Sequence, residues 1–273
     1  MATAGRAIAP EILEFYGDVY DESTRLTASA DGALELLRTQ ELLRRHLPPA
    51  PARVLDVGGG PGAHARWLCK DGYTVHLVDP VPKHIEQAAD VGCTTELGDA
   101  RALTADDGVY DVALVLGPLY HLLEEGDRAL ALREAGRVVR PGGLVVAAAI
   151  NRYASLFEHT ATTFLGREPV RDAVEDILAN GRHEPGRKGF TAAYFHTGPE
   201  LADEMAAAGL TDVTVYGIEG PTWSLLKATE QHTETSLIDS PMFTAALAAA
   251  RLAEPYPDLL AASSHLLAVA VVG

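Results

Sequence analysis

The sequence predicts an α/β fold built on a doubly wound, mostly parallel sheet. Three observations lead to this prediction. Strand-like apolar runs alternate with helix-like segments, a glycine-rich turn follows the first run, and several runs are apolar throughout. Strands of this last kind are typical of parallel sheets that helices cover on both faces.

The first half of the chain alternates regularly between the two kinds of segment. Residues 11–47 are predicted to be helical, because Leu34, Leu37, Leu42 and Leu43 recur near the 3.6-residue period and a proline-rich run follows them. The segments predicted next are a strand at 53–57, a helix at 63–71, a strand at 74–79, a helix at 82–90, a weak strand at 93–97, a strand at 109–116, a helix at 126–139 and a strand at 144–150.

The pattern changes after residue 150. Residues 151–197 are rich in arginine, histidine, glycine and aromatic side chains and are predicted to form an inserted cap. A regular order returns with a helix at 199–208, a strand at 212–218, a helix at 241–253 and an apolar strand at 265–272. The prediction is a single domain, 1–273, divided into an N-terminal helical cover (1–50), a ligand-binding core (51–150), the cap (151–197) and the remainder of the sheet (198–273).

Composition narrows the range of partners. The net charge is -16, and only four of the 22 basic residues are lysines, so neither nucleic acid nor an anionic membrane surface is an expected partner. Cys69 and Cys93 show no CxxC spacing, which argues against a zinc site or a disulfide framework. The longest apolar stretch, 144–150, is too short to cross a bilayer, and the N-terminus lacks the apolar region of a signal peptide. The predicted location is cytoplasmic.

The stretch from Val54 to Gly62 carries the strongest functional signal. An apolar strand runs into a turn in which Gly58 and Gly60 remove side chains where a ligand approaches the backbone. Exposed amides at such a turn bind anionic or polar groups. Asp79 ends the second strand about twenty residues later, where a carboxylate can accept two hydrogen bonds from a ribose diol. The alternative without a ligand is a glycine-rich connection between strand and helix.

A dinucleotide-binding dehydrogenase is a rival interpretation, because Gly58, Gly60 and Ala63 fit the pattern G-x-G-x-x-A. Asp56 argues against it, since an acid two residues before the turn suits a cationic ligand better than a pyrophosphate. Asp99, after the third strand, places another acid at the same sheet edge. The chain also has no Tyr-x-x-x-Lys pair, a common dehydrogenase acid/base pair.

Residues 50–150 resemble the class I, Rossmann-like S-adenosylmethionine-dependent methyltransferases of small-molecule type, and the rest of the chain resembles them in outline. The run Arg137–Gly143 before the fifth strand is a further shared feature. The resemblance implies a seven-stranded sheet with an antiparallel last strand, a direction that the apolar pattern alone leaves open. It also implies S-adenosyl-L-methionine as the cofactor and methyl transfer to O, N or C of a small-molecule acceptor.

The resemblance further assigns parts of the cofactor to parts of the chain. Residues 56–62 would wrap its methionine end, Asp79 would bind the ribose hydroxyls, and Asp99 would meet the adenine amino group. Leu116 and Gly117 would line the methionyl part beside the transferred methyl. The residues predicted to bind the cofactor are Tyr20, Asp56, Gly58, Gly60, Gly62, Asp79, Pro80, Asp99, Ala100, Leu116 and Gly117.

The segment Leu116–His121 departs from one branch of the family. DNA and protein-glutamine methyltransferases often carry Asn/Asp-Pro-Pro-Tyr there, whereas this chain reads Leu-Gly-Pro-Leu-Tyr-His. Because no side-chain amide or carboxylate is present to hold a planar amino group, nucleobase N-methylation is disfavoured.

His121 is the predicted general base, because it follows the fourth strand at the edge where open α/β sheets bind ligands. A histidine that only packs at the pocket wall is the alternative. His196 is the second catalytic candidate, because with Tyr194 it closes the cap where the chain returns to the core. No metal is predicted, since the histidines lack a ligand spacing.

Aromatic residues supply the remaining site predictions. Tyr20, in preference to Tyr16, is predicted to meet the cofactor sulfonium by cation–π attraction. Tyr120, Tyr194 and Trp223 are the predicted substrate contacts, with core packing as the alternative for Trp223. A small-molecule substrate is the expected partner, and homodimerisation is left open. The alternatives to methyl transfer are a non-catalytic cofactor-binding protein and an NAD-dependent oxidoreductase.

Overall fold

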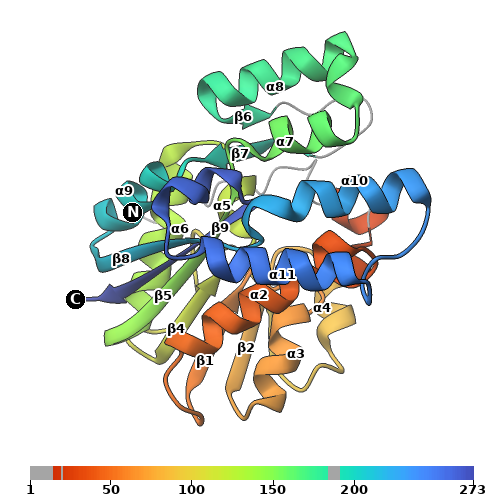
Figure 1. The fold of residues 1–273 in the computed structure, drawn as a ribbon. Helices are drawn as coiled ribbons and strands as arrows, with labels where there is room; N and C mark the ends of the chain where they lie inside the picture. The colour runs from red at the N-terminus through yellow and green to blue at the C-terminus, as the bar shows by residue number, and fades with distance from the viewer. Residues whose placement is uncertain (1–14, 20, 184–190) are drawn as a thin grey trace.

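The computed structural model describes residues 15–19, 21–183 and 191–273 (Figure 1). Its strands are β1 (Arg53–Val57), β2 (Thr74–Asp79), β3 (Thr94–Leu97), β4 (Tyr110–Val115), β5 (Val139–Asn151), β6 (Arg182–His183), β7 (Ala193–His196), β8 (Leu210–Gly217) and β9 (His265–Val272). Its α-helices are α2 (Ala30–His46), α3 (Ala63–Lys70), α4 (Pro82–Ala88), α5 (Pro118–His121), α6 (Glu125–Val138), α7 (Ala154–Ala161), α8 (Glu168–Asn180), α9 (Gly198–Ala207), α10 (Trp223–Thr233) and α11 (Pro241–Ala253). The short turns of helix are η1 (Phe15–Val19), η2 (Glu22–Thr24), η3 (Phe164–Gly166), η4 (Gly220–Thr222) and η5 (Pro257–Ala262).

The main sheet has the strand order β3-β2-β1-β4-β5-β9-β8. The strands from β3 to β5 pair in parallel, whereas β9 is antiparallel to both β5 and β8. This arrangement confirms the predicted seven-stranded, mostly parallel sheet with an antiparallel last strand. Two short strands were not predicted: β7 pairs with the end of β5 through Ile150–Phe195 and Asn151–His196, and β6 pairs with β7.

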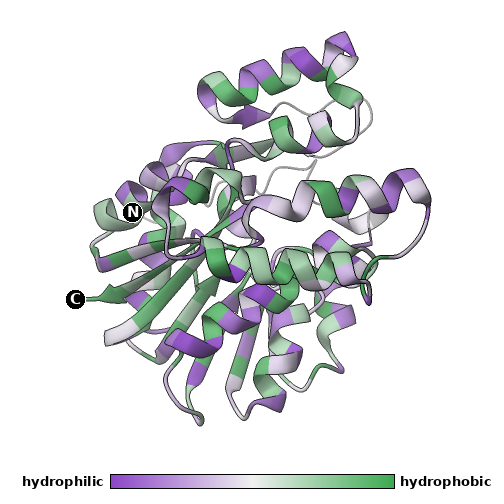
Figure 2. Ribbon diagram, in the orientation of Figure 1, coloured by the Kyte–Doolittle hydropathy of each residue, from purple (hydrophilic) through white to green (hydrophobic). Residues whose placement is uncertain are grey.

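Apolar side chains on the two faces of the sheet form two separate cores. In β1, Leu55 and Val57 face the core that also contains α6 and α9, whereas Val54 faces the core that contains α2 and α3. Successive residues of a strand point to opposite faces, so a continuous apolar run serves both cores. Figure 2 shows the hydrophobic colour concentrated along the strands and on the helix faces that cover them.

The N-terminal segment differs from the long helix predicted over 11–47, of which residues 11–14 lie outside the described residues. In the part that is described, η1 and η2 precede α2, which begins only at Ala30. Ser29 caps this helix, because its side chain accepts a hydrogen bond from the amide of Gly32. The chain therefore turns before α2, and this turn brings η1 and η2 to the carboxyl ends of the strands.

The segment predicted as a cap contains α7, η3, α8, β6 and β7 and lies at one end of the molecule (Figure 1). The pairing of β7 with the end of β5 attaches it to the sheet. Between β8 and β9 the chain forms α10 as well as the predicted helix α11, so α10 was missed. No helix within the described residues has the length and apolar character needed to cross a bilayer.

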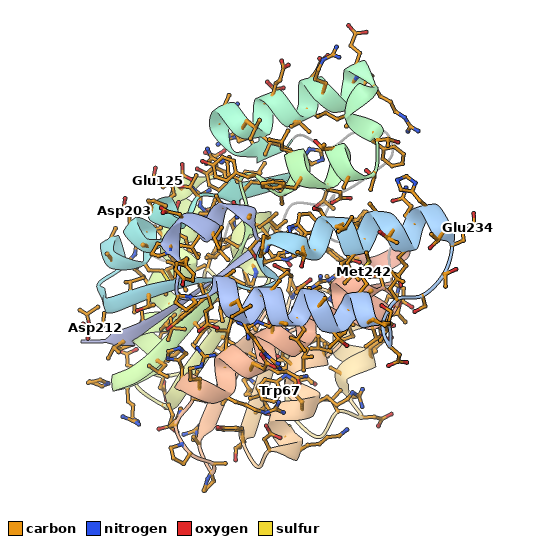
Figure 3. All side chains as sticks on the ribbon, in the orientation of Figure 1. Trp67, Glu125, Asp203, Asp212, Glu234 and Met242 are labelled. Atoms are coloured by element: carbon orange, nitrogen blue, oxygen red, sulfur yellow. The ribbon has the colours of Figure 1, made fainter. Side chains whose placement is uncertain are left out.

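Acidic side chains are spread over the surface of the molecule. Figure 3 shows Glu125, Asp203, Asp212 and Glu234 at its periphery, and all four are exposed. They contribute to the net charge of -16.

Candidate active site

A cavity of about 520 Å³ lies at the carboxyl ends of β1, β2 and β4, the edge at which open α/β sheets bind ligands. The predicted cofactor-binding residues that line it are Asp56, Gly58, Gly60, Asp79, Pro80, Asp99, Ala100, Leu116 and Gly117. Gly62 is not among the described residues of its wall, and Tyr20 lies outside the described part of the chain.

The glycine-rich turn can form only with glycine at several positions. Gly58 has a φ of 67°, and a Cβ there would meet Pro118 Cγ at 2.6 Å. Gly62 has a φ of 83° at the N-cap of α3, where a Cβ would lie 3.0 Å from Val91. At Gly60 a Cβ would find its nearest neighbours at 3.8 and 4.0 Å, so the backbone there is open to an approaching ligand. Gly62 thus shapes the turn, while Gly58 and Gly60 also line the cavity.

Asp56 is buried beneath this turn, with only 1% of its surface exposed. Burial, and secondarily the charge of Asp79, raises its pKa from 3.8 to about 7. Its Oδ2 atom has no hydrogen-bond partner among the residues that the structure describes. A buried carboxylate oxygen without a partner is costly, so a cationic ligand group in the cavity would compensate the charge of Asp56.

Asp79, at the end of β2, is held by several hydrogen bonds. The amide of Gly60 donates to Oδ2 at 2.9 Å, and the amide of Val81 donates to Oδ1 at 2.9 Å. His84 Nδ1 lies 3.0 Å from Oδ1. The carboxylate therefore connects the glycine-rich turn to α4 while it lines the cavity.

Asp99 is engaged by Arg101, which sequence reasoning did not consider. The Arg101 guanidinium contacts Asp99 Oδ2 at 2.7 Å and Asp127 Oδ2 at 3.1 Å. All three side chains line the cavity. Because Arg101 competes for this carboxylate, Asp99 is less available to a ligand than its strand-end position suggested.

His121 ends α5, just after β4, and lines the cavity beside Tyr120. Its Nε2 lies 3.0 Å from the hydroxyl of Tyr16, and its Nδ1 lies 3.4 Å from Thr191 Oγ1. Burial lowers the pKa of His121 to about 4, so the ring is neutral at neutral pH. A neutral imidazole in this place can accept a proton from a hydroxyl.

An ion-pair network forms another part of the wall and was missed by the sequence analysis. Arg25 donates to Glu35 at 2.7 and 3.0 Å and to Glu22 at 2.5 Å, while His265 Nδ1 lies 2.5 Å from Glu219. The neighbouring carboxylates raise the pKa of His265 to about 9 despite its burial. Glu35, Glu219 and His265 have the spacing of a metal site. In the structure these three side chains are joined to one another and to Arg25 by hydrogen bonds and ion pairs.

Several known proteins that are similar to this chain are methyltransferases. A family model described as a methyltransferase domain matches residues 54–143. A ubiquinone biosynthesis O-methyltransferase of Methylocella silvestris is 32% identical over 190 residues, which cover 66% of this chain and 68% of that protein. The chain belongs to the class I S-adenosylmethionine-dependent methyltransferases.

Two further similarities agree with this assignment. An uncharacterised methyltransferase of Mycobacterium tuberculosis is 35% identical to this methyltransferase over 167 residues, 57% of this chain and 67% of the other. A solved structure of an S-adenosylmethionine-dependent methyltransferase from Thermotoga maritima has the same fold, with a TM-score of 0.59 at 19% identity over 96% of this chain and 98% of the other. The family assignment favours methyl transfer over an NAD-dependent oxidoreductase or a non-catalytic cofactor-binding protein.

The cavity of this methyltransferase fits S-adenosylmethionine, its cofactor. The cofactor carries a sulfonium and an ammonium group, and Asp56 offers a buried carboxylate oxygen without a partner. The open backbone at Gly60 and the carboxylate of Asp79 suit a ligand that also carries a ribose diol.

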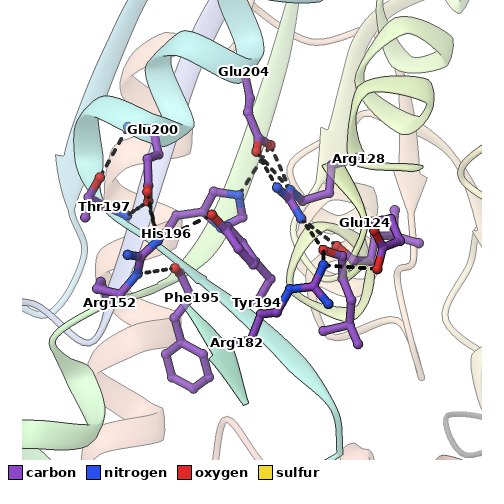
Figure 4. A network of polar contacts seen from close by, with 12 residues as sticks. Glu124, Arg128, Arg152, Arg182, Tyr194, Phe195, His196, Thr197, Glu200 and Glu204 are labelled. Atoms are coloured by element: carbon purple, nitrogen blue, oxygen red, sulfur yellow. Dashed lines mark hydrogen bonds and ion pairs between the residues drawn. The ribbon is translucent and has the colours of Figure 1, made fainter. Parts of the chain in front are cut away.

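Two predicted residues of the cap lie elsewhere. Tyr194 and His196 are not among the described residues that line the cavity; they belong to the polar network of Figure 4. The Arg128 guanidinium lies 3.8 Å from the centre of the Tyr194 ring, and Glu204 lies 3.4 Å from His196 Nε2. His196 is fully buried. The structure thus places both side chains beside the ion pair between Arg128 of α6 and Glu204 of α9, with Tyr194 half-buried, and not on the described wall of the cavity.

Trp223 also packs away from the cavity. Its side chain is 2% exposed and lies in an apolar cluster with Ala30 and Leu34. Its indole N–H donates to the carbonyl of Ala262 at 3.0 Å. The structure thus places Trp223 in a core, the alternative given for it, and not on the described wall of the cavity. Tyr120 does line the cavity, and burial raises the pKa of its phenol.

Tyr16 and His84 line the methyltransferase cavity although the sequence analysis passed over them. Tyr16 was considered as the aromatic residue near the sulfonium, but Tyr20 was preferred to it. His84 follows Asp79 by five residues at the start of a helix, a spacing that returns a side chain to the strand end. That spacing was the only available signal for His84.

Replacement of Asp79 is expected to weaken cofactor binding more than replacement of Asp99. Asp79→Ala removes an acceptor that also holds the amides of Gly60 and Val81, whereas Asp99 is already occupied by Arg101. Charge-assisted hydrogen bonds lead us to expect a rise of about 10- to 100-fold in the Kd of S-adenosylhomocysteine for Asp79→Ala. Calorimetric titration of Asp79→Ala and Asp99→Ala with S-adenosylhomocysteine measures both Kd values. An equal rise in Kd for the two variants would contradict the prediction.

Proposed function

We propose that this methyltransferase transfers the methyl group of S-adenosylmethionine to a hydroxyl oxygen of a small-molecule acceptor, with His121 as the general base. The observation that carries the proposal is a neutral, half-buried imidazole on the cavity wall, four residues after Gly117. The relative from Methylocella silvestris supports it, because that protein is described as an O-methyltransferase.

The hydrogen bonds of His121 support one tautomer. Thr191 donates its hydroxyl proton to the carbonyl of Ala192 at 3.2 Å, which leaves its oxygen to accept from Nδ1–H of His121. Nε2 then carries the lone pair, and Tyr16 donates to it. An acceptor hydroxyl that takes the place of the Tyr16 hydroxyl would present its proton to Nε2.

When bound, the cofactor supplies an electrophilic methyl group on its sulfonium. The residues of the chain align the acceptor, exclude water and remove the proton. As the new O–CH₃ bond forms, the bond between the methyl group and sulfur would break and leave a neutral thioether. The O–H bond of the acceptor would break in the same step, and its proton would move to His121 Nε2. Although a pKa of about 4 makes His121 a weak base, the oxygen becomes far more acidic as it gains the methyl group, so proton transfer in concert with methylation is favourable.

We also propose that the segment 151–197 acts as the cap of the acceptor site. Thr191 reaches His121 from this segment, and Ala192 lines the cavity next to it. Other parts of the cavity wall come from α2 and from the ends of β5 and β9, which contribute Glu35, Ala148 and His265.

Isotope transfer tests the proposed acceptor atom. The enzyme is incubated with S-adenosylmethionine that carries a ¹³C-labelled methyl group and with hydroxyl-bearing acceptors, each paired with its methyl ether as a control. The carbon chemical shift of the product distinguishes a methyl group on oxygen from one on nitrogen or carbon. Labelled product from the free hydroxyl alone supports the proposal, and a label on nitrogen or carbon refutes it.

A further inference from the structure

The carboxylate of Asp79 has little capacity left for a ribose. An ionised carboxylate offers about four acceptor positions. In this protein the amides of Gly60 and Val81 and the ring of His84 occupy three of them. About one position remains for a ligand, whereas a ribose diol has two hydroxyl groups to satisfy. The other hydroxyl therefore needs a second partner, which a further polar group on the cavity wall can supply.

His84 has an unused hydrogen-bonding atom at this place. Because Nδ1 donates to the Asp79 carboxylate, Nε2 is the remaining ring nitrogen. His84 is only 4% exposed and lines the cavity, and Nε2 finds no hydrogen-bond partner within the described residues. A Cβ on Gly60 would lie 4.0 Å from His84 Nδ1, so the imidazole adjoins the open part of the glycine-rich turn.

We propose that His84 and Asp79 share the ribose diol of the cofactor, one hydroxyl bonding to the carboxylate and the other to His84 Nε2. The hydroxyl can serve either charge state of the ring, because it both donates and accepts. His84 is thus a cofactor-binding residue as well as the group that orients Asp79. The proposal rests on the cofactor assigned to this methyltransferase but is independent of the acceptor.

A purely structural histidine fits these observations less well. Such a residue would be expected to use both ring nitrogens, because a buried polar atom without a partner is destabilising. The ring of Tyr16 lies 5.6 Å from that of His84, centre to centre, and covers it in an edge contact. Asp56 Oδ2, the other cavity atom without a partner discussed above, faces the same ligand site.

The test compares two substitutions that separate the two ring nitrogens. His84→Asn keeps an N–H donor near the position of Nδ1, so it can still orient Asp79, but it lacks Nε2. His84→Phe keeps the ring packing against Tyr16 and loses both nitrogens. Calorimetry measures the Kd of S-adenosylhomocysteine and of its 2′-deoxy and 3′-deoxy analogues for the wild-type protein and for both variants.

We expect His84→Asn to raise the Kd of S-adenosylhomocysteine by about 3- to 10-fold, the effect of losing one neutral hydrogen bond. For one of the two deoxy analogues, the Kd of this variant should equal that of the wild-type protein, because that analogue lacks the hydroxyl that Nε2 would bind. His84→Phe should show a further loss with all three ligands, since Asp79 also loses its orienting partner. His76→Asn is the control, because His76 contacts Thr94 and Glu96 away from the cavity.

Two results would overturn the proposal. Unchanged affinity of His84→Asn for S-adenosylhomocysteine would show that Nε2 makes no bond to the cofactor. An equal loss for S-adenosylhomocysteine and both analogues would assign His84 a structural role only. Because no acceptor is present in these titrations, failure of the proposed hydroxyl methylation would leave their outcome unaffected.

Discussion

Replacement of His121 by glutamine is expected to lower kcat by about 10²- to 10⁴-fold, the contribution of a general base. Glutamine retains hydrogen-bonding groups for Tyr16 and Thr191 but cannot take up the proton. The Kd of S-adenosylhomocysteine should change little, because the predicted role concerns the acceptor. Steady-state kinetics at saturating cofactor, together with calorimetry, separate the two effects.

The pH dependence provides an independent measure of this role. Burial holds the pKa of His121 near 4 instead of 6.5, so the base is deprotonated at all higher pH values. The acid limb that His121 contributes to kcat/KM for the acceptor should therefore lie near pH 4. The loss in His121→Gln should also shrink as the acceptor hydroxyl becomes more acidic, because an acceptor that enters as its anion needs no base.

His232 supplies the matched control for this substitution. It is an exposed histidine on α10 that contacts the carbonyl of Ala161 and does not line the described cavity. His232→Gln should leave kcat and the cofactor Kd unchanged. The base assignment fails if His121→Gln retains wild-type kcat, or if it loses cofactor affinity and kcat to the same extent.

Replacement of Asp56 by asparagine is expected to stabilise the cofactor-free protein at pH 8 while it weakens cofactor binding. Burial raises the pKa of Asp56 from 3.8 to about 7, so the folded protein holds this proton where the unfolded chain has released it. The folded state thus binds more protons between these pH values, and its stability falls as pH rises through that window. The shift of about three units corresponds to at most about 4 kcal/mol.

Asparagine keeps the shape of Asp56 and removes its charge. We expect a higher melting temperature for Asp56→Asn than for the wild-type protein at pH 8, and a much smaller difference at pH 4. The Kd of S-adenosylhomocysteine should rise by about 10-fold or more, because the carboxylate no longer compensates the cationic ligand group. In the wild-type protein, binding near pH 7 should release a proton, which calorimetry detects by repeating the titration in buffers of different ionisation enthalpy.

Asp111→Asn is the matched control and should act with the opposite sign. The amide of Arg53 and the guanidinium of Arg140 lower the pKa of Asp111, so its charge stabilises the folded state. Its neutralisation should lower the melting temperature at pH 8 and leave cofactor binding unchanged. Equal destabilisation by both substitutions would show that the charge of Asp56 is compensated within the protein itself.

The positions of the acidic residues could be predicted because they depend on strand ends. Asp56 and Asp79 belong to short apolar runs, and the ends of neighbouring parallel strands meet at one edge of a sheet. Their partners could not be predicted. Arg101 engages Asp99 from two residues away, and His84 reaches Asp79 only because α4 turns back toward the end of β2. Such pairings depend on side-chain direction, which the residue pattern does not specify.

Among the candidate histidines and aromatic residues, packing between distant segments decided which ones reach the cavity. Tyr16 meets His121 across 105 positions of sequence, because the chain turns between η1 and α2. His196 was the second catalytic candidate in the sequence, and in the structure it is buried beside Glu204 and the ion pair of Arg128.

The sequence by itself determined the order and type of the main strands, the glycine-rich turn and the cofactor class, because each depends on local periodicity or on one short motif. Only the tertiary structure decided which side chains line the cavity. It placed His121, Tyr16 and His84 on one cavity wall and buried Trp223 in a core. The physical reason is that a side chain's surroundings arise from long-range packing, whereas a strand or turn is specified by its own neighbouring residues.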